Sequence, residues 1–192
     1  MSKYTSRLHN KAGLTLVETT IVLAIVSVII SAVWMVSSVV YENAHQYQAN
    51  RQLQAIVQNV RQLYARLNAL TNLADVTITL DAQAAFPIEM RVNQSNAAGL
   101  INHPWASTAT GSVKIFNRTS TTFGVVFSNL PKKACIGLAT KLTGGEITNL
   151  SQVIINGTIT PSSALPISVV SANLSCTSPN ANSFEWQFNI RG

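Results

Sequence analysis

The chain has 192 residues, which suits one domain of ordinary size together with a membrane segment. Charged residues make up only 10% of the chain, and the formal net charge is +6. The basic residues are scattered apart from Lys132-Lys133 and form no run or aromatic-interleaved patch, so we expect no specific nucleic-acid partner.

The N-terminal end combines a short basic segment with a long apolar one. Residues 1–12 contain Lys3, Arg7 and Lys11 and no acidic residue. Residues 21–40 then contain no charge, Pro or Gly, and a run of about 20 apolar residues is long enough to cross a bilayer core. Because positive charge stays on the cytoplasmic side, the sequence predicts a cytoplasmic N-terminus and a C-terminal domain on the opposite side of the membrane.

A single carboxylate, that of Glu18, stands at the head of the apolar run. An ionised group in such a segment is costly unless it finds a partner, so Glu18 is a candidate functional residue. The alternative is that Glu18 lies in the interfacial region and contacts lipid headgroups.

A long helix is predicted from about Leu14 to Leu73, because no Gly or Pro interrupts this stretch. Residues 14–40 form its hydrophobic half and residues 41–73 its amphipathic half. Apolar residues of the second half recur at intervals of three and four and make one stripe: Leu53, Ile56, Val57, Val60, Leu63, Tyr64, Leu67 and Leu70. A coiled-coil stalk is the alternative, but apolar heptads are not sustained beyond about three repeats.

Residues 74–192 are rich in Thr, Ser, Asn, Val and Ile, a composition typical of strands and turns. Leu130–Thr143 is the exception, since its apolar residues recur by four after Pro131 and predict a small helix. Residues 93–110 are predicted to form a loop. The predicted strands are 76–80, 113–118 and 122–128 (a hairpin), 152–156, 167–171 and 184–190. The fold class is therefore α+β, a long helix followed by an antiparallel sheet.

The sequence contains no recognisable catalytic, cofactor or metal site, so we expect no enzyme activity, no cofactor and no metal. His9, His45 and His103 are isolated, and no phosphate loop or nucleophile–base arrangement is evident. Cys135 and Cys176 have no metal-ligand spacing. They are expected to form a disulfide if the domain lies outside the cytoplasm, and to remain two buried thiols if it lies inside.

Gly13 followed by Leu-Thr-Leu-Val-Glu and an apolar run resembles the class III signal of prepilins. The resemblance implies that residues 1–13 are a leader peptide. It further implies that prepilin peptidase, a membrane-embedded aspartyl protease, cuts after Gly13 and then N-methylates Leu14. Pseudopilins share this N-terminal motif.

The C-terminal domain resembles that of type IVb pilins, among them bundlin, toxin-coregulated pilin and the thin-pilus pilins of conjugative plasmids. The resemblance rests on Asn102-His103-Pro104-Trp105, on the helix around Cys135 (residues 130–140), and on Cys176 followed by residues 182–187. It implies a pilin fold with one disulfide between Cys135 and Cys176, and a loop between these cysteines that is exposed on the filament.

The resemblance implies a structural subunit, the major pilin of a type IVb pilus used for adhesion, aggregation or conjugative mating contact. The implied partners are other copies of the chain in a helical filament, prepilin peptidase, the inner-membrane assembly machinery and, before assembly, the bacterial inner membrane. Glu18 would pair with the Leu14 amine of a neighbouring subunit and set the axial register. The alternatives are a minor pilin, a type II secretion pseudopilin, or a single-pass anchored binding domain that never polymerises.

Overall fold

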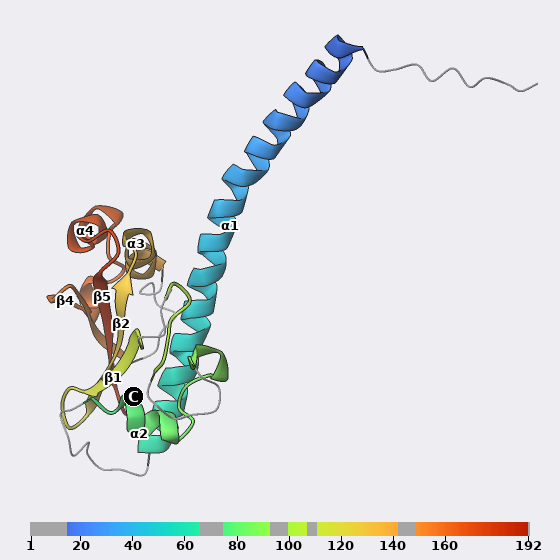
Figure 1. Ribbon diagram of the computed structural model, residues 1–192. Coiled ribbons are helices and arrows are strands. Elements are labelled where there is room, and N and C mark those ends of the chain that lie inside the picture. Colours follow the sequence, from blue (N-terminus) through green and yellow to red (C-terminus); the bar gives the residue numbers. More distant parts are fainter. Residues whose placement is uncertain (1–14, 66–74, 93–99, 107–110, 142–148, 192) are drawn as a thin grey trace, which may run out of the picture. The chain divides into compact units, whose positions relative to one another are not determined.

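The computed structural model describes residues 15–65, 75–92, 100–106, 111–141 and 149–191. The chain divides into two compact units, Met1–Tyr41 and Glu42–Gly192. Helix α1 (Leu16–Tyr64) contributes residues to both of them (Figure 1).

In the first unit, α1 consists almost entirely of exposed apolar side chains, from Leu16 to Tyr41. Within the described residues, α1 is the one helix that is long and apolar enough to cross a membrane. This agrees with the predicted hydrophobic half of the helix, because side chains that pack on nothing in the monomer require lipid or protein around them.

In the second unit, α1 is amphipathic, as its sequence pattern predicts. Ala49, Leu53, Ile56, Val57 and Val60 are buried and belong to the same core as the inner face of the sheet. The helix ends at Tyr64, earlier than the predicted Leu73, and Ala65 lies in a turn. Val60 is the last fully buried member of the stripe, so the tertiary packing that stabilises the helix weakens there. Residues 66–74 lie outside the described residues.

A five-stranded antiparallel sheet forms the rest of the second unit, in the order β1-β2-β5-β3-β4. The strand bounds are β1 Val113–Asn117, β2 Thr122–Leu130, β3 Leu150–Ile155, β4 Thr158–Pro161 and β5 Asn182–Asn189. Alternate residues of these strands face the core, with Phe123, Phe127, Phe184, Trp186 and Phe188 fully buried. The β1–β2 hairpin and the last strand were predicted from the sequence.

Helix α3 (Lys132–Lys141) confirms the small helix predicted around Cys135. It lies next to α4 (Val169–Ser175) at one end of the sheet (Figure 1). Two 3₁₀ turns, Ile88–Met90 and Ser162–Ala164, complete the described elements.

The strand predicted at 167–171 is wrong, because Val169–Ser175 is helix α4. Two successive valines favour strand on propensity alone. The Ser168 side chain, however, caps the helix by accepting a hydrogen bond from the Ser171 backbone N–H (3.1 Å). Buried Ala172 and Cys176 then hold the helix against the domain, so tertiary context overrides local preference.

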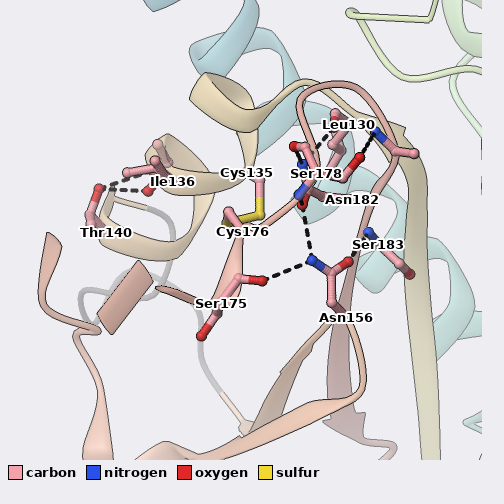
Figure 2. The surroundings of a disulfide bond; sticks show 12 residues. Leu130, Cys135, Ile136, Thr140, Asn156, Ser175, Cys176, Ser178, Asn182 and Ser183 are labelled. Carbon is pink, nitrogen blue, oxygen red and sulfur yellow. Dashed lines mark hydrogen bonds between the residues drawn. A yellow bond between two sulfur atoms is a disulfide. The ribbon is translucent and has the colours of Figure 1, made fainter. Parts of the chain in front are cut away.

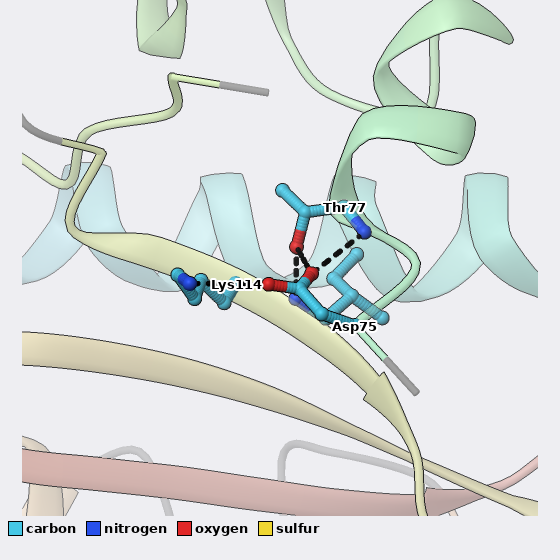
Figure 3. Close-up of polar contacts among 4 residues, drawn as sticks. Asp75, Thr77 and Lys114 are labelled. Carbon is cyan, nitrogen blue, oxygen red and sulfur yellow. Dashed lines mark hydrogen bonds and ion pairs between the residues drawn. The ribbon is translucent and has the colours of Figure 1, made fainter. Parts of the chain in front are cut away.

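The strand predicted at 76–80 is also wrong, because Thr77–Ala82 is helix α2. Asp75 precedes this helix, and its carboxylate accepts a hydrogen bond from the Thr77 backbone N–H (3.0 Å) (Figure 3). The same carboxylate forms an ion pair with Lys114 of β1 (3.1 Å). The polar start of the turn and its attachment to β1 together outweigh the β-branched composition of the segment.

Candidate functional site

Thr15 marks the beginning of α1. It lies just outside the helix, its carbonyl oxygen accepts a hydrogen bond from the Thr19 N–H (3.1 Å), and its Oγ1 accepts one from the Glu18 N–H (3.3 Å). These contacts define an N-cap residue. The predicted cleavage and methylation residues, Gly13 and Leu14, lie outside the described residues.

The Glu18 side chain is exposed at the third position of this helix, surrounded by exposed Leu16, Val17, Ile21 and Val22. Among the residues that the structure describes, no donor or cation bonds its carboxylate. In a capping box the carboxylate of such a residue bonds back to the N-cap N–H, but here only the threonine half of the pair is formed. Within the described part of the chain, the Glu18 carboxylate thus has no bonded partner.

Cys135 of α3 and Cys176, the residue after α4, form a disulfide with a Cα–Cα distance of 6.0 Å (Figure 2). Both cysteines are fully buried. The bond links α3 to the segment that precedes β5 and closes a loop with a sequence separation of 41. This is the pairing that the resemblance to pilins implied.

A buried asparagine, Asn182, connects the disulfide region to the sheet (Figure 2). Its Nδ2 donates to the Leu130 carbonyl (3.0 Å), and its Oδ1 accepts from Asn156 Nδ2 (2.9 Å) and from the Ser178 N–H (3.0 Å). Asn156 Nδ2 also donates to the Ser175 carbonyl at the end of α4 (2.8 Å). These bonds hold the end of α4 against the turn between β3 and β4.

Asn156 and Gly157 form that turn with positive φ angles of 49° and 86°. Neither this hairpin nor its strand β4 was predicted from the sequence. The signal was present, since Asn-Gly between two apolar runs is the strongest short-range indication of a two-residue hairpin.

The Asn102–Trp105 motif joins three parts of the second unit. Asn102 Oδ1 accepts from the Ser112 N–H (3.1 Å), His103 Nε2 donates to the Ser128 carbonyl (2.8 Å), and the Trp105 indole donates to the Glu42 carboxylate on α1 (3.2 Å). Burial lowers the pKa of His103 below its ordinary value of 6.5, and the hydrogen bond to Ser128 only partly opposes this shift.

From β3 to α4, the disulfide-closed loop exposes several apolar side chains and contains no charged residue. On α4, Val169, Val170 and Leu174 are 65%, 72% and 72% exposed, and Ile159 of β4 is also exposed. The sequence contains no Asp, Glu, Lys or Arg from Ile147 to Phe184. Contacts made by this surface would therefore bury no formal charge.

The chain was compared with known proteins. A family model of the prokaryotic N-terminal methylation motif matches residues 8–34. A solved type IVb pilin from Salmonella typhi has a similar fold, with a TM-score of 0.56 and 18% identity over 73% of this chain and 97% of that chain. TcpA, a type IV pilin from the Vibrio cholerae El Tor biotype, matches with a TM-score of 0.48 and 12% identity over 75% of this chain and 98% of that one. No curated protein sequence matches significantly.

The methylation motif, the long apolar helix and the disulfide-closed sheet domain define the class as a type IV pilin of the IVb kind. Within that class the chain belongs to the bundlin family, whose model matches residues 38–189. The protein is accordingly a pilin subunit, and members of this class polymerise into filaments after processing at the methylation motif.

Proposed function

We propose that this chain is the major subunit of a type IVb pilus. Its precursor is held in the bacterial inner membrane by residues 14–40, with the leader, residues 1–13, in the cytoplasm. The amphipathic helix half, residues 41–73, and the globular domain, residues 74–192, are on the opposite side. Prepilin peptidase cuts after Gly13 and methylates the Leu14 amine, and the inner-membrane assembly machinery then adds the subunit to an extracellular filament.

The observation that carries the proposal is the Glu18 side chain, which is exposed on an apolar helix with no bonded partner among the described residues. Packing such helices together in a filament core would bury this carboxylate, and a buried lone charge costs several kcal/mol. Cleavage after Gly13 creates a matching positive charge at Leu14. The next acidic residue along the chain, Glu42, is about 36 Å away by helical rise.

Pairing between Glu18 and the Leu14 amine of a neighbouring subunit therefore fixes the axial register of the filament. Setting register is the best-attested use of a buried charged pair. Adhesion, aggregation and conjugative mating contact are all served by such a filament, and its low-charge, Ser/Thr/Asn-rich surface is compatible with each of them.

The test is the N-terminus and the abundance of the protein in filaments sheared from the cell surface. Mass spectrometry is expected to show a chain that lacks residues 1–13 and carries one added methyl group, as the dominant protein of the filament. A Gly13→Val precursor should stay uncut, because a side chain hinders close approach of the peptidase to the backbone, whereas His9→Val should be cut normally. Uncut protein confined to membranes would contradict the proposal, and trace amounts in filaments would indicate a minor pilin.

A further inference from the structure

Asn156 and Gly157, the two residues of the turn between β3 and β4, form the single Asn-Gly pair of the 192-residue chain. Both residues are exposed. Glycine has no side chain that would hinder its backbone nitrogen from reaching the asparagine side chain. The space around Gly157 is also open, since an added Cβ atom would meet no heavy atom within 4 Å apart from the chain neighbours. The pair therefore has the composition and the room for a reaction between its two residues.

That reaction is deamidation. The Gly157 nitrogen adds to Cγ of the Asn156 side chain, its proton passes to the departing amide nitrogen, and the bond from Cγ to that nitrogen breaks. Ammonia leaves, and a five-membered succinimide ring remains. Water then opens the ring at either carbonyl and gives aspartate or isoaspartate, in which the main chain runs through Cγ. Each step consumes only water, and a neutral amide is replaced by a carboxylate.

In the folded domain, three hydrogen bonds hold the Asn156 amide in place (Figure 2). Nδ2 donates to the Ser175 carbonyl (2.8 Å) and to Asn182 Oδ1 (2.9 Å), and Oδ1 accepts from the Ser183 N–H (2.8 Å). The Asn156 backbone N–H also donates to the Ser183 carbonyl (3.0 Å). An amide held at both its nitrogen and its oxygen cannot rotate to present Cγ to the Gly157 nitrogen unless these bonds open.

We propose that Asn156 is a latent deamidation site, which stays intact while its amide bonds Ser175 and Asn182 and reacts when the end of α4 detaches. The product cannot restore these contacts, because a carboxylate has no N–H to donate and would face two acceptor oxygens. It would also be the only formal charge between Ile147 and Phe184. Deamidation thus makes an opening of this end of the domain irreversible. This reactivity does not depend on the proposed processing or assembly.

The first experiment follows deamidation of the full-length protein in detergent by peptide mass spectrometry, in the native state and after unfolding in guanidinium at the same pH. Asn156 should react at least about tenfold more slowly in the native protein, since hydrogen bonds must open before the attack. Asn129 and Asn149 are internal controls, because they also have positive φ angles (60° and 65°) but precede leucine. Both should stay intact in guanidinium while Asn156 reacts. Equal native and unfolded rates at Asn156, or equal reaction of all three asparagines in guanidinium, would overturn the proposal.

A variant separates the hydrogen bonds of Asn156 from folding in general. Asn182→Ala removes one acceptor of the Asn156 amide, so native deamidation should be about fivefold faster than the globally unfolded fraction accounts for. Ser178→Ala is the matched control, because its hydroxyl bonds the Ala181 N–H (3.0 Å) and not Asn156, and its rate should follow the unfolded fraction alone. An Asn182→Ala rate explained wholly by global unfolding would overturn the proposal. If Asn182→Ala does not fold, the wild-type comparison decides.

Asn156→Asp tests whether the aspartate product loosens the end of α4. The Cys176 N–H donates to the Ala172 carbonyl there (2.9 Å), and its hydrogen should exchange at least about fivefold faster in this variant than in the wild type. Asn180→Asp adds the same charge at an exposed position between α4 and β5, and should leave that exchange unchanged. Equal exchange in Asn156→Asp and the wild type would show that the turn accommodates the carboxylate, and would overturn the irreversible opening.

Discussion

At the scale of single residues, Gly124 on β2 leaves space for an ion pair on the outer face of the sheet. Arg118 donates from Nε and Nη2 to the two carboxylate oxygens of Glu185 (2.7 and 2.6 Å), and Gln187 Nε2 also donates to Glu185 (2.8 Å). A Cβ atom at position 124 would overlap Glu185 Oε1. The glycine is therefore required by the neighbouring strand and not by its own backbone angles.

Gly124→Ala is expected to destabilise the protein by about 1–3 kcal/mol, because the added methyl displaces a carboxylate that three hydrogen bonds hold in place. The measurement is the free energy of unfolding in urea. In a Glu185→Ala background the same substitution should cost much less, since the overlapping group is absent. Equal costs in the two backgrounds would show that the crowding has another source.

His103 makes stability dependent on pH. The folded state lowers the pKa of His103 through burial, so the unfolded chain binds the proton more tightly. The contribution of neutral His103 to the free energy of unfolding is fully present above the pKa of the unfolded chain, about 6.5. It is lost as the pH falls below that pKa. We expect the free energy of unfolding to decrease from pH 8 to pH 5, with a smaller decrease in His103→Gln. Identical slopes for the two proteins would assign the dependence to other groups.

At the scale of elements, helices and strands with a regular apolar periodicity were predicted correctly from the sequence. Elements that are selected by contacts with distant residues were not. The strict alternation of residues 184–190 and the spacing by four around Cys135 gave β5 and α3 correctly. Val169 and Val170 were misassigned to a strand, because only the Ser168 cap and the attachment at Cys176 select the helix. Strand β4 was overlooked, although its Asn156-Gly157 turn could have revealed it.

In the candidate site, too, one feature could be predicted from the sequence and another could not. The disulfide could be predicted, because the chain has only two cysteines and resembles pilins that pair them. The four hydrogen bonds of the Asn182 side chain could not be predicted. Their partners are spread over residues 130–178, and no local pattern brings them together. Glu18 was identified from the sequence as a candidate functional residue, and its role in assembly stays a prediction.

The disulfide is expected to supply a large share of the stability of the α3–α4 end of the domain. In the chain-entropy model, closing a loop of this length contributes roughly 4 kcal/mol. A Cys135→Ser, Cys176→Ser protein should lose about 2–5 kcal/mol of unfolding free energy in urea. Because both disulfide-bonded cysteines are buried, reductant should act on the native wild type only slowly. A loss below about 1 kcal/mol would indicate that α3 and α4 hold together without the bond.

At the scale of the whole molecule, Glu18→Gln should separate processing from assembly. The amide keeps the shape of the side chain but cannot balance the charge of a neighbouring Leu14 amine. We expect leader cleavage to proceed and the yield of sheared filaments to fall at least about tenfold, which corresponds to about 1.4 kcal/mol, well below the cost of a buried unpaired charge.

Ser27→Ala is the matched control for this substitution. Ser27 lies in the same apolar segment, and its hydroxyl bonds only the Ala24 carbonyl of its own helix (2.8 Å), so filament yield should be unaffected. Normal filaments from Glu18→Gln would contradict the register role, and loss of filaments from both variants would indicate a general sensitivity of the segment to substitution.

The disulfide also determines how the subunit would carry mechanical load. When the chain is pulled from its two ends, covalent tension passes from Cys135 through the sulfur–sulfur bond to Cys176. Residues 136–175, which include β3, β4 and α4, lie beside that path and bear none of the tension. A proteolytic cut among them leaves the two halves covalently joined. Breakage of the chain anywhere between the two cysteines would thus not sever the subunit.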